Sequence, residues 1–529
     1  MAPWPELRTI TASVERQLFP TSSLAMIALL VALLPATATA GSKQRFVSGP
    51  CTDAARHGMP NGEEHDHLKV RQHRRGCRVR QVAFDSLRDE LSARNDVVLG
   101  EMDVRKGLAA VAVAYPESGL LLFDVSNPAR PRFLSWYRSS ECEGALIDVD
   151  CGAFVSLSRS AKTAFLSSQD ISVVPGGFSP GVTPAPIPGV EVIDVSDPRD
   201  PSLAQLYPVL SEGGVHTSNS QVIPNRGGPG PRAPGEYLFS VANGLGVQVS
   251  KIEEGGGPLT LTPVKLIEID EVHDTFIQND RLTDRTYLYV AAGLASGFYV
   301  YDVTDPAQPK LLAEWDLTPQ CEEDWYSHTI DVAIRGGRRY VTMPSELFEQ
   351  GEQSEEDQAE GCGKVLGNGD KAGPLWIVDA TNLSKLGPPD DVGDGNELAI
   401  KRNSREALVA TWRNPARRDA GNLLFSPHNQ QVVGSRIYLS HYHGGVYVLD
   451  ASAAFKGRRV RPRDLGFIVP HGREKRPLYE ATIAPLVIPF FSTFPPGRST
   501  IWDMVFYRGY VLAADMYGGF YSLQFAGDR

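Results

Sequence analysis

A short phrase that recurs along the chain limits what this sequence can fold into. Residues 119–131 read GLLLFDVSNPARP, residues 189–201 read GVEVIDVSDPRDP, and residues 297–309 read GFYVYDVTDPAQP. Four looser copies keep the run of alternating apolar residues. The polar residues that end the seven runs are Asp124, Asp194, Lys251, Asp302, Asp379, Asp450 and Gln524. Repetition of this kind indicates one structural unit that is used seven times.

Each copy of the phrase lies within the same order of short β-patterned runs. In the fourth unit TYLYVAAG (286–293) precedes the phrase and KLLAEWDL (310–317) follows it. Four such runs, separated by Gly, Pro, Asn and Asp turns, predict a four-stranded antiparallel sheet. One small sheet cannot bury both of its faces, whereas seven sheets arranged radially can, with few open edges. The sequence therefore predicts an all-β fold, a seven-bladed β-propeller over residues 97–525.

The phrase itself is predicted to form the turn between the third and fourth strands of each blade. Asp and Ser/Thr side chains bind nearby backbone groups in tight turns, and proline ends strand pairing because it lacks an N–H. An active-site role for Asp302 and its equivalents is the weaker interpretation, because a catalytic residue is not needed once per repeat. The last unit lacks a fourth run. Part of residues 78–99 is therefore expected to pair as the outer strand of the last blade and to close the ring.

The first 40 residues have the pattern of a signal peptide. Arg8 and Arg16 precede the apolar run LAMIALLVALL (24–34), and small residues at 38 and 40 suit cleavage before Gly41. The run is too short to span a bilayer, although a retained anchor stays open as the alternative. We expect a mature protein without a membrane span that is secreted, periplasmic or at the cell surface. Residues 41–96 would form a loop region that includes the ring-closing strand.

All six cysteines follow the expected cleavage site, and an even number in an exported chain predicts disulfide bonds. The predicted strand register places Cys321 and Cys362 in loops on the same face, so these two are expected to pair. A local pair of Cys142 with Cys151 would leave Cys51 for Cys77. The sequence contains no CxxC pair, so a thiolate zinc site is not expected.

Three insertions interrupt the repeat, at 175–189, 345–373 and 456–500. The first is rich in Pro and Gly, the second is acidic, and both are placed between the second and third strands of their blades. Insertions on one face of a repeat ring often form its binding surface. The net charge of −11 argues against a nucleic-acid partner, which needs a concentrated basic surface. The expected ligand is therefore a protein or a small molecule.

Two segments near the C-terminus support a resemblance to a known family. The segments SPHNQQVVGSRIYLSHYHGGVYVLDAS (426–452) and IWDMVFYRGYVLAADMYGGFYSL (501–523), with the Asp-Val-Ser-Asp-Pro phrase, resemble the LVIVD-repeat proteins. That resemblance implies an exported β-propeller over roughly 97–525 and implies little about activity. A more distant similarity is to the selenium-binding protein and methanethiol oxidase family, which are propellers with histidine-bound metal. The cysteine motifs of that family are absent here, which argues against a thiol oxidase.

Histidines recur at one position of the repeat, just before the innermost strand. His216, His273, His328 and His428 occupy it, and Trp502 and Met102 stand at the same place in units seven and one. Innermost strands line the central channel of a propeller, so these side chains are expected to surround one mouth of it. His441 and His443 lie in the turn between the second and third strands of unit six. Antiparallel pairing would bring that turn to the same face.

Two interpretations of these histidines remain open. Neutral imidazole is a common ligand of transition metals, so the six histidines could bind one divalent ion, Cu, Zn, Fe or Mn, supported by Asp274, Asn429 and Asp503. The protein would then be a metal-dependent oxidase or hydrolase. Alternatively, these residues hydrogen-bond neighbouring blades, and the protein is an exported binding module that acts through its loop-decorated face. The sequence carries no hydrolase, metalloprotease or nucleotide-binding motif. It favours the binding module and leaves open whether the protein is an enzyme.

Overall fold

The structure is a computed structural model. It describes residues 76–87, 98–115, 118–139, 149–170, 189–209, 211, 213–225, 230–253, 259–293, 297–316, 326–346, 373–386, 403–415, 425–470, 499–516 and 518–528. Two compact units divide the chain, Met1–Thr37 and Ala38–Arg529, and every described residue belongs to the second. The expected signal peptide, residues 1–40, lies outside the described residues, so export stays a prediction. No helix in the described part of the chain is long and apolar enough to cross a membrane.

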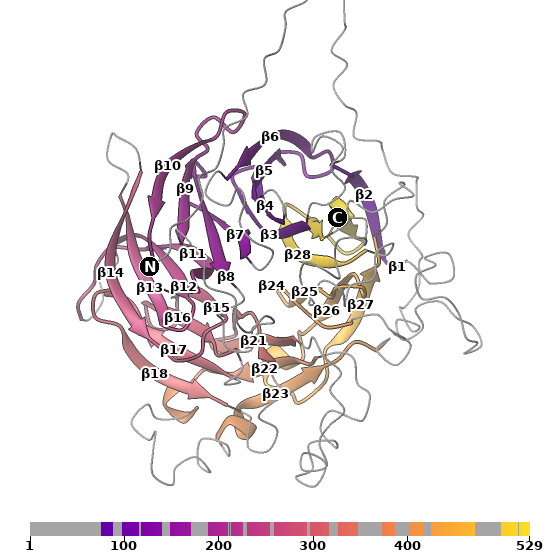
Figure 1. Ribbon diagram of the computed structural model, residues 1–529. Coiled ribbons are helices and arrows are strands. Elements are labelled where there is room, and N and C mark those ends of the chain that lie inside the picture. Colours follow the sequence, from indigo (N-terminus) through magenta and orange to yellow (C-terminus); the bar gives the residue numbers. More distant parts are fainter. Residues whose placement is uncertain are drawn as a thin grey trace, which may run out of the picture. The chain divides into compact units, whose positions relative to one another are not determined.

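Seven small antiparallel sheets follow one another along the second unit and form a ring, as Figure 1 shows. The first four blades contain β3 (Val98–Arg105), β4 (Leu108–Tyr115), β5 (Gly119–Asp124) and β6 (Arg132–Arg138); β7 (Val149–Leu157), β8 (Thr163–Asp170), β9 (Val190–Asp194) and β10 (Ser202–Tyr207); β11 (Val215–Ile223), β12 (Gly235–Ala242), β13 (Gly246–Glu253) and β14 (Thr260–Glu268); and β15 (Asp274–Asp280), β16 (Arg285–Ala291), β17 (Phe298–Asp302) and β18 (Lys310–Trp315).

The last three blades follow the same order. They contain β20 (Asp331–Arg335), β21 (Arg338–Glu346), β22 (Leu375–Asp379) and β23 (Leu408–Trp412); β24 (Gln430–Val433), β25 (Arg436–Ser440), β26 (Val446–Asp450) and β27 (Arg463–Ile468); and β28 (Ile501–Tyr507), β29 (Tyr510–Asp515) and β30 (Gly519–Phe525). A short strand, β19 (Tyr326–Ser327), pairs with the end of β21. Described helical structure is limited to the 3₁₀ turns η2 (Leu383–Lys385) and η4 (Ala454–Lys456) and to residues 403–407. The predicted seven-bladed β-propeller is confirmed.

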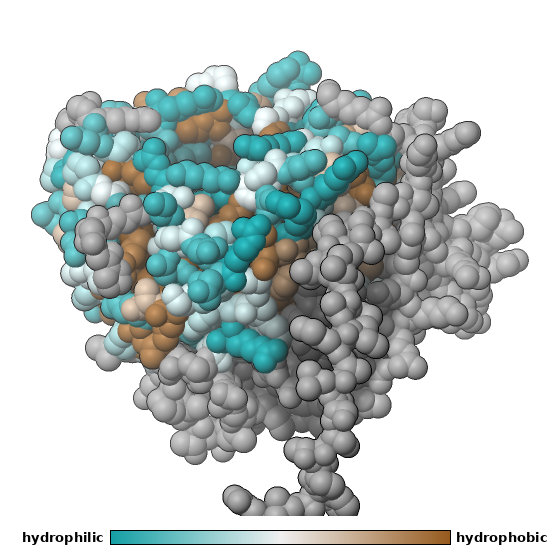
Figure 2. Space-filling view, turned by 90° about the horizontal axis from the view of Figure 1, so that it is seen from above, coloured by the Kyte–Doolittle hydropathy of each residue, from teal (hydrophilic) through white to brown (hydrophobic). Residues whose placement is uncertain are grey.

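Burial along the strands follows their place in the blade. The second strand β16 is buried over all but its first residue, because the neighbouring blades cover both faces of each sheet. The outer strand β14 is instead mostly exposed or half-buried, and only Leu261 and Ile267 are buried. Figure 2 shows one face of the molecule, on which hydrophilic side chains predominate and hydrophobic ones occur in separate groups. The exposed large hydrophobic residues among those described are Leu203, Leu206, Leu245, Leu282 and Val460, which belong to four different blades.

The recurring phrase forms the turn between the third and fourth strands. Asp302 Oδ1 accepts a hydrogen bond of 3.0 Å from the backbone N–H of Thr304, two residues further along. The same bond joins Asp124 to Ser126, Asp194 to Ser196, Asp379 to Thr381 and Asp450 to Ser452. The carboxylates therefore stabilise the turns, and the structural role predicted for the phrase is confirmed.

The glycine that opens the phrase is required by the close approach of the fourth strand. A Cβ atom on Gly297 would lie 2.0 Å from the carbonyl oxygen of Trp315, and one on Gly519 would lie 2.2 Å from that of Asp85. The φ angles of the two glycines, +86° and +113°, also favour glycine. The same close approach occurs at Gly119, Gly246 and Gly445. A side chain here would push the outer strand away from its sheet.

An N-terminal segment closes the ring. Strand β2 (Val79–Asp85) pairs antiparallel with β30 and supplies the outer strand of the last blade. The two-residue strand β1 (Gly76–Cys77) pairs with β27 of the sixth blade. One segment thus joins two neighbouring blades, and the strand predicted to close the ring is confirmed.

Two of the predicted insertions contain strand residues. Strand β21 continues through Ser345 and Glu346, because the backbone of Glu346 still pairs with Tyr326 of β19. The acidic insertion therefore begins two residues later than the sequence suggested. The third insertion, 456–500, contains the fourth strand of the sixth blade, β27. The other residues of these insertions lie largely outside the described part of the chain.

The cysteine pairing stays a prediction. Cys77 is buried in β1. Its expected partner Cys51 lies outside the described residues, as do Cys142, Cys321, Cys362 and the side chain of Cys151.

Replacing Gly519 with alanine is expected to weaken ring closure. The new Cβ would collide with the backbone of Asp85 in β2 and would also strain the positive φ. We expect a loss of about 2–5 kcal/mol in the free energy of unfolding, measured by chemical denaturation. The matched control is Gly336→Ala, at φ +56° with no atom within 4 Å of the added Cβ, which should lose about 1–2 kcal/mol from backbone strain alone. Equal losses in the two variants would contradict the closure argument.

Candidate metal centre

Four histidines from four successive blades form an arc. His216 lies in β11, and His273, His328 and His428 precede the first strands of the next three blades. The centroids of neighbouring rings are 4.3 Å apart for His216–His273, 4.2 Å for His273–His328 and 4.0 Å for His328–His428. We call these four residues the histidine arc. The repeat position identified in the sequence therefore does bring these four rings together.

Two further rings extend the arc at its ends. Phe154 of β7 lies 4.2 Å from the ring of His216, and Trp502 of β28 lies 4.5 Å from the ring of His428. Trp502 was placed at this repeat position from the sequence, whereas Phe154 was not. Six blades therefore each contribute one ring to a continuous row.

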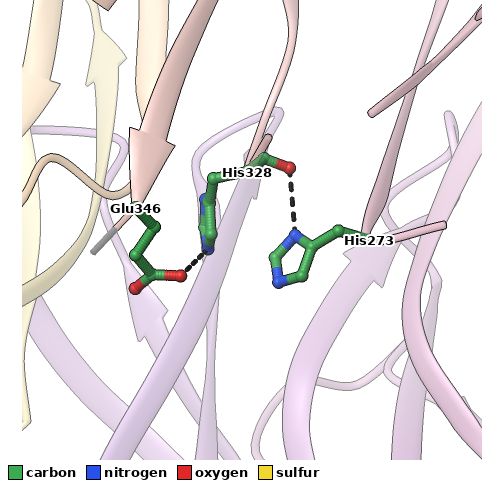
Figure 3. A group of neighbouring side chains, drawn as sticks. All are labelled: His273, His328 and Glu346. Atoms are coloured by element: carbon green, nitrogen blue, oxygen red, sulfur yellow. Dashed lines mark hydrogen bonds and ion pairs between the residues drawn. The ribbon is translucent and has the colours of Figure 1, made fainter. Parts of the chain in front are cut away.

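Glu346, the last residue of β21, faces the arc, as Figure 3 shows. Its Oε2 atom lies 3.1 Å from Nε2 of His328, and its Oε1 atom lies 3.6 Å from Nε2 of His428. His273, His328 and Glu346 are all buried, and each offers a ligand atom within 4.8 Å of the other two. Two imidazoles and one carboxylate are a donor set that divalent transition metals use. Glu346 was not expected from the sequence, because it was counted with the acidic insertion. A carboxylate at the end of a long apolar strand is the sequence feature that could have indicated it.

Tyr442 also reaches this group from the turn after β25. Its hydroxyl donates a hydrogen bond to Oε1 of Glu346, and its ring lies 5.1 Å from that of His428. The φ angle of Tyr442 is +37°, which is uncommon for a bulky residue. The backbone here is therefore a tight turn between β25 and β26, in agreement with the turn expected for this segment.

His441 lies elsewhere, between the fifth and sixth blades. Its ring packs 5.5 Å from Trp412 of β23 and 5.4 Å from Tyr447 of β26. Its Nδ1 atom is 3.4 Å from the amide nitrogen of Asn414. His443 is fully buried in the same turn. The described contacts of the arc therefore involve four of the six histidines that the sequence suggested as ligands.

The polar residues that follow the arc positions join neighbouring blades. Asp274 Oδ1 accepts a hydrogen bond of 2.9 Å from the hydroxyl of Thr217. Asn429 donates through Nδ2 to Asp503 Oδ1 at 2.9 Å, and Asp503 Oδ2 accepts from the backbone N–H of Met102 at 2.7 Å. Asp274, Asn429 and Asp503 thus have the blade-joining role that the second interpretation expected.

Glu101 is a further carboxyl in this region, half-buried in β3. Its Oε1 atom accepts a hydrogen bond of 2.9 Å from Asn429 Nδ2. Burial, and next the charge of Asp503, raise the pKa of Glu101 well above its usual value. From the sequence, Met102 was expected at this position of the repeat. A register shift in β3 between Leu99 and Met102 puts Met102 into the apolar core instead, which sequence periodicity could not show.

Burial sets the protonation states at the arc. It lowers the pKa of His273 and of His328 to about 3, and it lowers the pKa of His216 and His428 well below the usual value. Burial also raises the pKa of Glu346 to about 8. Neutral imidazole is the form that binds metal, whereas the carboxyl must lose its proton on binding.

Comparison with known families finds one match, over residues 111–138, to the LVIVD repeat. This propeller carries an LVIVD repeat. The matched segment covers the second half of β4, all of β5 and all of β6 in the first blade. Comparison of the LVIVD-repeat chain with curated proteins gives no match. The more distant similarity to selenium-binding proteins stays a prediction.

Several solved structures are similar to this LVIVD-repeat propeller. Sqt1 of Saccharomyces cerevisiae is 11% identical, with 81% of this chain and 96% of that chain covered and a TM-score of 0.41. The β-propeller domain of Cps50 (Swd1) from Myceliophteria thermophila is 9% identical, with 80% and 95% covered and a TM-score of 0.40. The periplasmic gluconolactonase PpgL of Pseudomonas aeruginosa is 12% identical, with 66% and 80% covered and a TM-score of 0.39. Similarities this low carry no argument about activity.

The metal-free protein is expected to lose stability as the pH rises from about 6.5 to about 8. The folded-state pKa of Glu346 is about 8 and that of Asp274 about 7, above the usual 4.5 and 3.8, so the folded protein binds more protons than the unfolded chain in this range. The stability that these groups contribute is present at lower pH and is lost as the pH rises through their folded pKa values. Buried histidines act in the opposite direction only below their usual pKa of 6.5.

The measurement is chemical denaturation with a chelator present at several pH values. A Glu346→Gln variant should give a flatter profile between about pH 6.5 and 8, because the amide does not titrate. A wild-type profile that rises with pH over this range, or an unchanged slope in Glu346→Gln, would contradict the assignment.

Proposed function

We propose that this LVIVD-repeat propeller is a metal-binding module that holds one divalent transition-metal ion at the histidine arc. The observation that carries the proposal is the group of His273, His328 and Glu346, whose ligand atoms lie within 4.8 Å of one another. His216 and His428 flank this group within the arc. The arc thus offers more nitrogen donors than the group alone.

The balance of charge around Glu346 supports a cation. Its described partners are His328, His428 and the hydroxyl of Tyr442. Burial keeps both of these imidazoles neutral at neutral pH, so none of the three supplies a positive charge. A buried carboxylate without a counter-charge is strongly unfavourable. A divalent ion at the arc would supply that charge and favour the ionised carboxylate.

The proposal also includes the location and the ligand expected from the sequence. The protein is exported, and it binds a small molecule or a protein through its loop-decorated face. A small molecule that reaches the arc would bind to the ion, beside the insertions that the sequence places on this face. A metal-dependent oxidase or hydrolase is the second candidate, because three protein donors leave coordination positions open for a reacting molecule.

The first test is the metal content of purified protein. We expect about one ion per chain after reconstitution with Fe, Cu, Zn or Mn salts and removal of excess, measured by elemental analysis. His273→Ala should weaken the apparent affinity by at least about tenfold, because it removes a donor, and the circular dichroism spectrum should stay unchanged. Asp274→Asn should have a smaller effect, since Asp274 joins blades and does not contact the ion.

His441→Asn is the matched control, because it changes a buried histidine outside the arc and should leave the metal content unchanged. A wild-type protein that stays metal-free with all four ions would contradict the proposal. Equal losses of metal in His441→Asn and His273→Ala would place the ion elsewhere.

A further inference from the structure

Glu346 and Tyr442 occupy the same position of the repeat in neighbouring blades. Glu346 lies two residues after Pro344, which pairs with the first residue of β22. Tyr442 lies two residues after Ser440, which pairs with the first residue of β26. The two side chains therefore leave equivalent strand ends of the fifth and sixth blades, and they meet between the blades beside the histidine arc.

Several contacts fix the place of the Tyr442 side chain. Its backbone carbonyl oxygen accepts hydrogen bonds from the N–H groups of Ile501 at 3.0 Å and Gly445 at 3.1 Å. Its ring is fully buried and lies edge-on to two others, 5.1 Å from His428 and 6.0 Å from Trp502. A bulky residue at a φ of +37° is strained, and strained residues that are held by their surroundings often occur at functional sites. The hydroxyl of Tyr442 therefore reaches the fifth blade from a fixed position.

This hydroxyl distinguishes the two oxygens of Glu346. It donates a hydrogen bond to Oε1, and Nε2 of His428 lies 3.6 Å from the same oxygen. Oε2 instead faces Nε2 of His328, 3.1 Å away, as Figure 3 shows. Oε2 is buried, and no described residue donates a hydrogen bond to it. Oε2 is therefore the oxygen of Glu346 that is available to an ion beside His273 and His328.

His273 is oriented in a corresponding way. Its Nδ1 atom lies 3.0 Å from the backbone carbonyl oxygen of His328. A carbonyl oxygen only accepts hydrogen bonds, so Nδ1 is the donor, and in the neutral ring Nε2 keeps its lone pair. Hydrogen bonds of this kind orient the ligands of metal sites and contribute to metal affinity. Two of the three donors in the group, His273 and Glu346, thus have one atom engaged by the protein and one atom left for an ion.

We infer that Tyr442 is a positioning residue for the proposed metal site: it holds Oε1 of Glu346, so that the carboxylate binds the ion through Oε2 alone. The inference rests on the proposed function, and it adds a residue of the sixth blade to a donor group that the fourth and fifth blades supply. Tyr442 itself does not contact the ion. With one oxygen from Glu346 and one nitrogen from each imidazole, the protein supplies three donors and leaves the other coordination positions to small molecules.

Zn(II) is the probe for this role, because it is redox-inert and binds to imidazole and carboxylate ligands. The metal-free protein is titrated with ZnCl₂ in competition with a chromophoric chelator. Tyr442→Phe keeps the ring and removes the hydroxyl, and it should weaken Zn(II) binding by about 10–100-fold. Tyr447→Phe is the matched control, because it removes another buried hydroxyl of the sixth blade, which donates to Asn414 Oδ1 at 3.0 Å. This control should bind Zn(II) as tightly as the wild type does.

A Glu346→Gln background tests whether Tyr442 acts through this side chain. In that variant the amide oxygen accepts the hydrogen bond of Tyr442, so the NH₂ group, which has no lone pair for a metal, faces the ion. Zn(II) binding should be weakened by at least about tenfold. Adding Tyr442→Phe frees the amide to turn its oxygen toward the ion, and it should tighten binding relative to Glu346→Gln alone. Because the second comparison predicts a gain, a folding defect cannot imitate it.

The outcomes separate the inference from the proposed function. Wild-type binding with undiminished affinity in Tyr442→Phe, or with an equal loss in Tyr447→Phe, would overturn the inference and leave the proposed metal site intact. So would the absence of a gain when Tyr442→Phe is added to Glu346→Gln. A wild-type protein that does not bind Zn(II) would overturn both.

Discussion

The pairing of β2 with β30 is the interaction on which the rest of the structure depends. Each blade buries its faces only against its neighbours, so the stack is stable when the last sheet is complete and the innermost strands β28 and β3 meet. The histidine arc depends on the same closure, because its four rings come from four blades. Their spacing therefore depends on how adjacent blades pack.

Burial determines the protonation states of the histidine arc and of Glu346. Removal from water keeps the imidazoles neutral and makes ionisation of Glu346 unfavourable, so neutral rings lie beside a carboxyl group that tends to keep its proton. Hydrogen bonds between blades, such as those of Asp503, stabilise the ring around this set. The two interpretations drawn from the sequence are therefore compatible. One set of residues joins the blades, and the rings of the residues just before them lie next to one another.

The sequence predicted the fold because the constraint is repeated: Gly297 and its equivalents serve the same steric purpose in five blades, and an Asp turn ends the third strand in five. It predicted the four arc histidines because they share one repeat position. It missed Glu101, Glu346 and Tyr442, which depend on a register shift, on a strand that extends into an acidic segment and on a positive φ angle. Such local departures from the repeat leave no periodic signal. His441 was expected at the arc for the same reason, because the conformation of its turn could not be predicted from the repeat.

The closing strand also has a consequence for the order of folding. Residues 79–85 pair with residues 519–525, so the contacts that complete the ring join segments at opposite ends of the propeller sequence. Contacts of such large sequence separation form slowly, because a long loop must be closed before they contribute stability. The four rings of the histidine arc, which span residues 216 to 428, belong to the ring that this step completes. Metal uptake at the arc, as proposed above, would follow this step and report that the ring has closed.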